Sequence, residues 1–418
     1  MLEGVAGWVP GEPVPNEALP AAWGVDDAWV RSRTGIASRH RAGRGVSTGD
    51  LAYEAARRLM GGGGPGPGAG GGSGPGSGAG AGDGPGADSG SGARGAAGGG
   101  PSAAAGGRAR GGSAAGSGAG SGGGAWGGGA VDAVVLATAT PDHPCPGTAP
   151  ALAARLGLGP VPAFDIGAVC SGFVYGLAVC QGLVVSGLYD RVLLVGADVY
   201  STWLDPRDRS SGVVFGDGAG AALIGAGTAG APGELLAFDL GSDGAGYDLI
   251  SVAAGGSRSR AAGRPPGEGD PYFRMRGRAV YQHAVERMTA SCRSLLGEVG
   301  WDPAEVDHFV PHQANARILR AVAERVGIGA DRCVTHLDRV GNTGAASIPL
   351  ALADAQDRGR FRTGDRVLLT AFGGGLTWGT AALRWPGTPR PDAPRPGTSQ
   401  AEAPGTSRAA AHDGRNGS

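Results

Sequence analysis

Short runs of β-branched and other apolar residues alternate with longer segments rich in alanine and leucine along most of this chain. The short runs predict buried strands and the longer segments predict helices. We predict strands at residues 130–137, 191–197, 212–215, 307–310 and 366–371. We predict helices at residues 50–59, 149–156, 170–186, 272–299, 315–326 and 345–358. Strands that alternate with helices indicate an α/β fold with buried, largely parallel sheets.

The two halves of the chain repeat one pattern. VDAVVLATATP (131–141) is similar to VDHFVPHQAN (306–315), and each is an apolar strand that ends at a turn. RVLLVGADVYS (191–201) is similar to RVLLTAFGGGLTWG (366–379). Two similar βα halves that meet at a shared cleft explain the repetition. We therefore expect catalytic residues at equivalent strand-to-helix corners of both halves.

Glycine is unevenly distributed and accounts for 86 of 418 residues. Residues 61–129 are almost entirely Gly, Ala, Ser and Pro, and residues 386–418 have a similar composition. Such segments cannot offset the entropy of ordering the chain, so we predict a disordered insertion and a disordered tail. The insertion is either passive or a docking segment for a partner. The globular sequence then divides into an N-terminal half, 1–60 with 130–229, and a C-terminal half, 230–385.

Charge and cysteine content exclude several classes of protein. The formal net charge of −1 provides no field that attracts nucleic acid or an anionic membrane. Five cysteines without a CxxC pair argue against a disulfide framework or a zinc site, and nothing in the sequence indicates another metal site. The N-terminus does not resemble a signal peptide, and no apolar run reaches the ~18–20 residues that span a bilayer. We expect a cytoplasmic protein.

Three side chains at strand-to-helix corners are candidates for catalysis. Cys170 follows the strand-like AFDI and begins an apolar helix, where backbone N–H groups would stabilise a thiolate and lower its pKa. His312 follows an apolar strand and can donate a hydrogen bond to a developing oxyanion. Asn342 lies among glycines ahead of a helix, with its amide free to face a cleft. Taken singly, each residue is more often structural: Cys170 as a buried thiol, His312 as a core histidine with its hydrogen bonds satisfied, and Asn342 as a helix N-cap.

Two glycine-rich segments allow further interpretations. In AFGGGLTWG (371–379) the backbone can approach a ligand closely, but a phosphate loop would need GxxxxGK[ST]. FGDGAGAAL (215–223) has Ala221 where a GxGxxG dinucleotide loop requires its third glycine, although some nucleotide sites tolerate alanine there.

Together these motifs resemble those of β-ketoacyl-acyl-carrier-protein synthase III. The matching segments are CSGF (170–173), PHQANARI (311–318), GNTGAASIPLAL (341–352) and FGGGLTWG (372–379), extended by WVRSRTGI (29–36) and DRSSGVVFGDGAGAAL (208–223). The resemblance covers about residues 2–60 and 130–385, which is nearly all of the globular sequence. It implies a thiolase-like fold with layered α-β-α-β-α architecture. It also implies an acyltransferase that condenses an acyl-CoA primer with malonyl-acyl carrier protein and initiates fatty-acid or polyketide chains.

The resemblance also implies roles for individual residues. Cys170 would be the nucleophile, His312 and Asn342 its partners in decarboxylative condensation, and the backbones of Cys170 and Gly374 the oxyanion hole. Coenzyme A would enter as a thioester substrate, with no separate cofactor and no metal. Residues near coenzyme A would be Trp29, Arg33, Arg209 and Asn315. A homodimer is expected by the same analogy.

Some positions depart from the family pattern. Cys145 stands where many relatives carry phenylalanine in the primer pocket, which either makes room for a longer or branched primer or is neutral. In a dimer this loop would lie against the neighbouring subunit.

Arg278 and Gln282 occupy positions where relatives often have Asn and Lys. Arg317, Arg320 and Arg325 share one predicted helix and either dock an acidic carrier protein or form a solvated face.

Two other functions fit the same residues. An acyltransferase would pass the acyl group from Cys170 to an alcohol or amine without releasing carbon dioxide. A scaffold would bind a carrier protein or partner subunit and form no acyl-enzyme.

Overall fold

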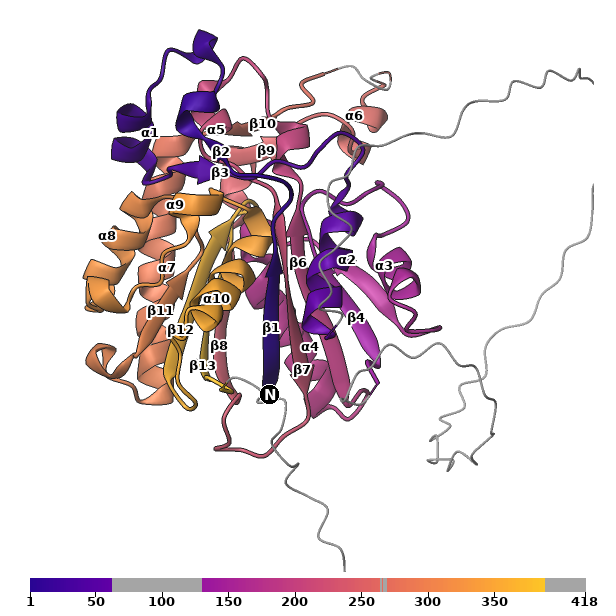
Figure 1. The fold of residues 1–418 in the computed structure, drawn as a ribbon, viewed down its shortest axis with the longest axis vertical. Coiled ribbons are helices and arrows are strands. Elements are labelled where there is room, and N and C mark those ends of the chain that lie inside the picture. Colours follow the sequence, from indigo (N-terminus) through magenta and orange to yellow (C-terminus); the bar gives the residue numbers. More distant parts are fainter. Residues whose placement is uncertain (62–129, 264, 266–268, 388–418) are drawn as a thin grey trace, which may run out of the picture.

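The computed structural model describes residues 1–61, 130–263, 265 and 269–387 (Figure 1). The predictions for most of the insertion and the tail lie outside these residues. The strands are β1 (Leu2–Trp8), β2 (Val14–Pro15), β3 (Ser38–Arg39), β4 (Ala133–Ala137), β5 (Ala163–Ile166), β6 (Arg191–Asp198), β7 (Gly218–Gly225), β8 (Leu235–Ser242), β9 (Ile250–Val252), β10 (Phe273–Met275), β11 (His308–Pro311), β12 (Arg366–Gly373) and β13 (Thr377–Arg384). The α-helices are α1 (Asp27–Thr34), α2 (Thr48–Leu59), α3 (Ala149–Arg155), α4 (Gly172–Val185), α5 (Arg209–Gly212), α6 (Ser257–Ala261), α7 (Gly277–Val299), α8 (Ala316–Val326), α9 (Leu337–Val340) and α10 (Ser347–Asp357).

Two larger sheets carry the fold, and the predicted repeat maps onto them. One has the order β1-β7-β6-β4-β5 and the other β11-β12-β13-β8. β4 and β6 pair in parallel in the first sheet, and β11 and β12, their counterparts in the repeat, pair in parallel in the second. The sheets are mixed, however, so the prediction of largely parallel sheets was wrong. β7 is antiparallel to both β1 and β6, and β13 is antiparallel to both β12 and β8.

The antiparallel strand β7 escaped prediction because it is built mostly from small residues. β7 reads GAGAALIG and has no β-branched run apart from Ile224. Its glycines are required by close packing, since a Cβ on Gly220 would lie 2.6 Å from Pro349 of α10. The same segment cannot be a dinucleotide loop, because its glycines enter a strand rather than a helix.

Apolar side chains on both faces of each sheet produce five layers. In β6, Val192 and Leu194 face a central core, whereas Leu193 and Val195 face the layer formed by α2 and α3. In β12, Leu369 faces the same central core and Leu368 faces α7 and α8. Helices α4 and α10 lie between the sheets, so the predicted α-β-α-β-α arrangement is confirmed (Figure 1). Burial of both faces explains why these strands are continuously apolar.

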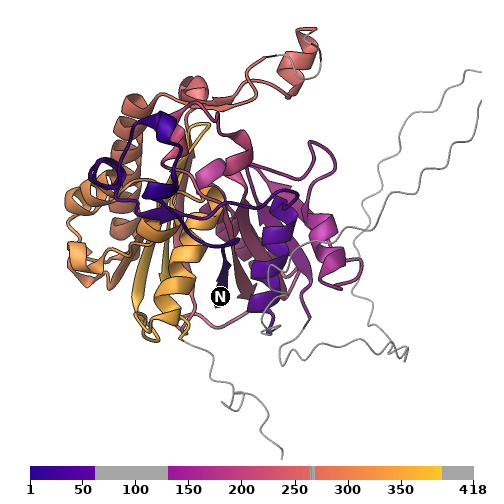
Figure 2. The same ribbon diagram turned by 45° about the horizontal axis from the view of Figure 1, so that its top comes forward.

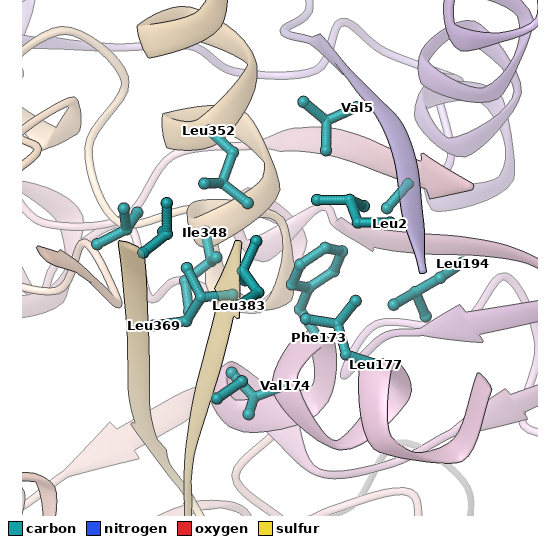
Figure 3. Close-up of a cluster of buried hydrophobic side chains, with 14 of the residues drawn as sticks. Leu2, Val5, Phe173, Val174, Leu177, Leu194, Ile348, Leu352, Leu369 and Leu383 are labelled. Carbon is teal, nitrogen blue, oxygen red and sulfur yellow. The ribbon is translucent and has the colours of Figure 1, made fainter. Parts of the chain in front are cut away.

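The central core joins both halves of the chain. Figure 3 shows Phe173 and Leu177 of α4 packed with Leu2 of β1 and Leu194 of β6, while Leu383 of β13 approaches from the other sheet. All these side chains are at most 2% exposed. The helix that follows Cys170 is therefore held between the two sheets.

Several predicted boundaries differ from the structure. Residues 212–215 are not a strand: Gly212 ends α5, and Phe215 makes an isolated bridge with Asn342. The helix predicted from 272 begins at Gly277, because Phe273–Met275 form β10 and pair with β9. α4 begins at Gly172, and Cys170 lies in a preceding 3-10 turn, Val169–Ser171.

One end of the layered core is covered by short elements. α1, α5, β2, β3, β9 and β10 gather there (Figure 1), and α6 stands out from the same end in Figure 2. The candidate catalytic residues are located beneath them, because β5 precedes Cys170 and β11 precedes His312. Carboxyl ends of parallel strands are the usual place for ligands in α/β sheets.

Candidate active site

A cavity of about 880 Å³ brings the three predicted catalytic residues together. Cys170, His312 and Asn342 all line it, although they come from turns that follow or precede different strands and helices. Trp29, Arg33, Asn315 and Arg317 line it as well. The sequence prediction that both halves contribute to one cleft is thus matched by the geometry.

The backbone around Cys170 is strained and closely packed. Val169, directly before it, has φ of +47°, a conformation that costs a β-branched residue on the order of 1–3 kcal/mol. A Cβ on Gly373 would lie 2.9 Å from the Cys170 backbone nitrogen, so only glycine permits β12 to approach this turn. Gly373 lines the cavity, whereas Gly374, the predicted member of the oxyanion hole, is not among the lining residues, and a Cβ added to it would lie 3.3 Å from Ile250.

The Cys170 thiol differs from the sequence expectation. Burial raises its pKa to about 12, and the nearby carboxylate of Asp198 acts in the same direction. A hydrogen bond from Tyr200 lowers the pKa, but this effect is smaller. The prediction of a lowered pKa was wrong because it weighed the helix N-terminus and not desolvation. The resting side chain is therefore a thiol.

His312 is a neutral imidazole with one ring nitrogen held by a serine hydroxyl. Its side chain is 3% exposed, and burial lowers its pKa to about 3. Nδ1 lies 2.6 Å from the hydroxyl of Ser347, whose oxygen also accepts a hydrogen bond from the backbone N–H of Gln313. When the Ser347 hydroxyl donates to Nδ1, the ring proton lies on Nε2 and this N–H is a donor.

Hydrogen bonds to neighbouring residues also fix the orientation of Asn342. Its backbone N–H donates to the Val214 carbonyl, and its carbonyl accepts from Gly216, both at 2.9 Å. Its side-chain Oδ1 accepts the backbone N–H of Gly344 at 3.0 Å. Because a backbone N–H can only donate, the oxygen is assigned and the amide NH₂ remains available as a donor. Gly341 has φ of +71°, which fits the need for glycine ahead of Asn342.

The carboxylate of Asp198 accepts hydrogen bonds from segments of both halves of the chain. Its Oδ1 accepts hydrogen bonds from the backbone of Ala139 and the hydroxyl of Thr138, and its Oδ2 accepts the backbone N–H of Ala345. It is fully buried, and burial raises its pKa to about 6. This carboxylate connects the end of β6 to the turn that carries Asn342.

The Trp29 indole, which lines the cavity, has two guanidinium groups near it. Arg33 lies 4.4 Å and Arg209 5.4 Å from the Trp29 ring centroid, so cation–π attraction holds both groups near it. Arg209 also donates to the Trp23 carbonyl at 3.0 Å, and it does not line the cavity itself. The structure thus groups three of the residues that the resemblance assigns to coenzyme A.

Asn315 and Arg317 connect α8 to the end of α1. Asn315 caps α8 by accepting from the backbone of Arg317, and its amide donates to the Arg33 carbonyl at 3.1 Å. Arg317 donates to the Ser32 carbonyl at 3.0 Å. Arg320 and Arg325 are exposed on α8 and do not line the cavity.

Cys145 is not brought to this site. It is exposed, in the loop between β4 and α3, and is absent from the cavity lining of its own chain. A primer-pocket role would require a second subunit.

Three residues at the site were missed by the sequence analysis. Tyr200 and Asp198 belong to RVLLVGADVYS, which was noted only as part of a repeat, although polar residues at a strand end are a usable signal. Ser347 lies inside GNTGAASIPLAL but gives no signal of its own, because its partner His312 is 35 residues away in sequence.

Within the described residues, no group of three or more His, Cys, Asp or Glu side chains is placed to hold a metal ion. In the same part of the chain no helix is long and apolar enough to cross a membrane.

The chain matches two family descriptions. Residues 164–244 match 3-oxoacyl-[acyl-carrier-protein (ACP)] synthase III, and residues 296–385 match its C-terminal region. It is 47% identical over 386 residues to β-ketoacyl-[acyl-carrier-protein] synthase III 5 of Streptomyces coelicolor, with 92% of this chain and 97% of that protein covered. It is 43% identical over 383 residues to β-ketoacyl-[acyl-carrier-protein] synthase III of Pseudomonas aeruginosa, with 92% and 96% covered.

Solved structures give the same result. The crystal structure of 3-oxoacyl-(acyl carrier protein) synthase III, FabH, from Pseudomonas aeruginosa PAO1 superposes with a TM-score of 0.73 at 40% identity, covering 93% of this chain and 99% of that one. The priming β-ketosynthase from the R1128 polyketide biosynthetic pathway superposes with a TM-score of 0.71 at 26% identity, covering 93% and 96%.

Proposed function

Because the chain belongs to the β-ketoacyl-acyl-carrier-protein synthase III family of acyltransferases, we propose that Cys170, His312 and Asn342 carry out its decarboxylative condensation. The reaction joins an acyl-CoA primer to malonyl-acyl carrier protein and initiates fatty-acid or polyketide chains. The observation that carries the assignment of roles is that His312 and Asn342 line one cavity with Cys170, each with one polar side-chain atom held by a neighbouring residue; we infer that each donates an N–H through its other polar atom.

Acylation is the first step. The Cys170 sulfur attacks the thioester carbonyl, the C–S bond to coenzyme A breaks, and the acyl group is transferred to Cys170. The proton that Cys170 loses ends on the coenzyme A thiol, so a resting thiol is compatible with the overall exchange. Backbone N–H groups of Cys170 and Gly374 stabilise the tetrahedral oxyanion. The Gly374 nitrogen is bonded to the carbonyl carbon of Gly373, which lines the cavity and allows this segment to approach Cys170.

Condensation is the second step. The C–C bond to the malonyl carboxylate breaks, carbon dioxide leaves, and the electron pair remains as an enolate. His312 Nε2–H and the Asn342 amide donate to the enolate oxygen. A neutral donor suits this role, because it stabilises developing charge without surrendering its proton. The enolate carbon then attacks the acyl carbonyl, and the released Cys170 thiolate takes up a proton.

Substrate binding uses the cavity entrance. Trp29, Arg33 and Arg209 receive the adenine and phosphates of coenzyme A, since guanidinium groups bind phosphate and an indole stacks on a base. Asn315 holds Arg33 through its carbonyl. Arg317, Arg320 and Arg325 of α8 present positive charge to an acidic carrier protein.

The enzyme works as a homodimer. β5 is an edge strand of its sheet and exposes Phe164, and α4 exposes Val185 at its end. An unpaired edge with apolar side chains favours pairing with a second copy. The exposed loop with Cys145 would then contact the partner's cavity. All five cysteines are unpaired, which supports the reducing cytoplasm as the compartment.

Release of carbon dioxide from malonyl-acyl carrier protein tests the assigned roles. We expect His312→Ala and Asn342→Ala each to lower this rate about 10²–10³-fold, because each removes one donor to the enolate. Acylation of Cys170 by acyl-CoA should persist in both variants. Equal loss of acylation and decarboxylation would contradict the division of roles, and acylation without any decarboxylation in the native chain would indicate transfer to an alcohol or amine.

A further inference from the structure

Two hydroxyl groups join the turn that carries Cys170 to the other half of the chain. Ser171 belongs to the turn itself and has no exposed surface, and Thr377 is the first residue of β13. Ser171 Oγ and Thr377 Oγ1 lie 2.8 Å apart, although 206 positions separate them in sequence. This is the usual length of a hydrogen bond between two hydroxyls, so a proton lies between them and connects the two segments. Neither residue lines the cavity.

Both hydroxyls also contact the carbonyl that precedes the strained Val169. The Ala168 carbonyl oxygen lies 2.8 Å from Ser171 Oγ and 3.2 Å from Thr377 Oγ1, and it accepts the Ser171 backbone N–H at 3.1 Å. Val169 comes directly after this carbonyl and has φ of +47°. Backbone strain persists only where surrounding contacts over-determine the conformation. The two hydroxyls are therefore among the contacts that hold the turn in its strained shape.

The same threonine holds the glycine segment that approaches this turn. Thr377 pairs with Gly373 at the end of the β12–β13 ladder, and its hydroxyl oxygen lies 3.0 Å from the Gly374 carbonyl oxygen. A Cβ added to Gly373 would lie 3.2 Å from the Ser171 nitrogen and 2.9 Å from the Cys170 nitrogen, so the two backbones are in close contact. Thr377 thus contacts both segments whose N–H groups form the oxyanion hole in the proposed function.

We propose that Thr377 is a positioning residue of the oxyanion hole, because its hydroxyl, bonded to Ser171 and to the Gly374 carbonyl, fixes the separation of the two backbone segments. This inference rests on the proposed function and adds a residue to the machinery of the same site. A backbone N–H stabilises an oxyanion only where the fold holds it at the right place, so the hole depends on side chains behind it. Since the Thr377 hydroxyl lies outside the cavity lining, it acts on the transition state of acylation and not on the binding of acyl-CoA.

Rapid-quench acylation followed by intact-protein mass spectrometry tests this role. The probe is the fastest-reacting of acetyl-, butyryl-, hexanoyl- and octanoyl-CoA. Thr377→Val keeps the shape of the side chain and removes its hydroxyl. We expect the acylation rate constant to fall about tenfold or more, because a displacement of about 1 Å in an active site can cost as much as 10²-fold. The half-saturating concentration of acyl-CoA and the fraction of enzyme finally acylated should stay unchanged, whereas poor folding would lower that fraction. A native rate constant in Thr377→Val would overturn the proposal.

Ser171→Ala removes the same hydrogen bond from its other end. It decides the question if Thr377→Val does not fold, since a native rate constant in Ser171→Ala would overturn the bridge. If the two hydroxyls act as one bridge, the double variant should be no slower than the slower single variant. Effects that multiply would contradict a shared role. Thr377→Ser retains the hydroxyl and should acylate at close to the native rate, and a rate as low as that of Thr377→Val would also overturn the proposal.

Thr380→Val is the matched control. Thr380 lies on the same strand, has no exposed surface and does not line the cavity. Its hydroxyl oxygen lies 2.7 Å from that of Ser291 and 3.0 Å from that of Thr370. The control therefore loses comparable hydroxyl–hydroxyl bonds and should keep the native acylation rate constant. A fall equal to that in Thr377→Val would overturn the proposal, whereas failure of every acyl-CoA to acylate the native chain would instead reject the proposed function itself.

Discussion

At the scale of single residues, one polar atom of each of the His312 and Asn342 side chains is held by a hydrogen bond to a neighbour. The Ser347 hydroxyl lies 2.6 Å from His312 Nδ1, and the Gly344 N–H donates to Asn342 Oδ1. Neither partner belongs to the cavity lining. The orientation of both side chains therefore depends on residues outside the cavity lining.

The lowered pKa of His312 predicts how condensation responds to pH. An ordinary imidazole gains a proton as the pH falls through 6.5, but burial keeps His312 neutral until about pH 3. Discharge of a preformed acyl-enzyme by malonyl-acyl carrier protein should therefore show no inflection from His312 between about pH 5 and pH 8. Rapid-quench measurement of this step across the range checks the prediction.

Asp198 provides the control for this measurement, because its raised pKa of about 6 falls in the same range. An inflection that disappears in Asp198→Asn belongs to the carboxyl group. One that remains in Asp198→Asn, centred near 6.5, would show that His312 titrates normally and contradict its assignment as a buried neutral donor.

The sequence predicted the three candidate residues that the structure brings to one cavity, but not the residues that position them. Cys170, His312 and Asn342 stand in motifs of small residues at strand ends, and this pattern is visible in the sequence. Tyr200 and Ser347 are ordinary residues whose importance arises from contacts across 30 and 35 positions. The pKa of Cys170 was also mistaken, because burial of a thiol depends on the whole fold.

At the scale of elements, α1 and α8 form the cavity entrance jointly, and Asn315 is the residue that connects them. It caps α8 and holds the Arg33 carbonyl at the same time. We expect Asn315→Ala to lower the free energy of unfolding by about 1 kcal/mol, as loss of an N-cap does. We also expect it to raise the KM for acyl-CoA several-fold, because Arg33 loses a fixed position.

Ser47→Ala separates these two effects. Ser47 caps α2 with a capping box and does not line the cavity. Urea denaturation should show a similar loss of stability for Ser47→Ala, with an unchanged KM. If both variants raise KM equally, the link between α8 and α1 does not contribute to coenzyme A binding.

Helices with a regular repeat of apolar residues were predicted correctly, whereas strands made mainly of small residues were not predicted. α2, α3 and α8 agree with prediction to within two residues, because their apolar faces repeat regularly. β7 and β13 were missed because close helix packing requires glycine and alanine there. As a result, the parallel pairs were anticipated and the antiparallel pairs were not.

At the scale of the whole molecule, the two halves share an arrangement, and each contributes to one cavity. β4 with β6 and β11 with β12 form equivalent parallel pairs, and α4 and α10 lie between the sheets. The sequence repeat predicted this shared arrangement, since the repeated segments include these strands. The repeat could not predict how closely the two halves pack. The buried core around Phe173 and Leu383 shows that close packing (Figure 3).

The exposed edge of β5 predicts association of two copies. We expect Phe164→Asp to convert a dimer into a monomer, because a charge would be buried at the interface. Sedimentation velocity gives the mass of each form. Val46→Asp is the control, since Val46 is 36% exposed and Phe164 38% exposed, but Val46 lies in the loop before α2. A native chain that sediments as a monomer, or dissociation of both variants, would contradict pairing through β5.

Intact-protein mass spectrometry of the enzyme after acetyl-CoA and then malonyl-acyl carrier protein tests condensation through Cys170 directly. We expect a mass increase of one acetyl group that is absent in Cys170→Ala. We also expect malonyl-acyl carrier protein to remove this increase, with release of carbon dioxide and formation of a β-ketoacyl product. An acetyl group that malonyl-acyl carrier protein cannot discharge, or one that also forms in Cys170→Ala, would contradict condensation through Cys170.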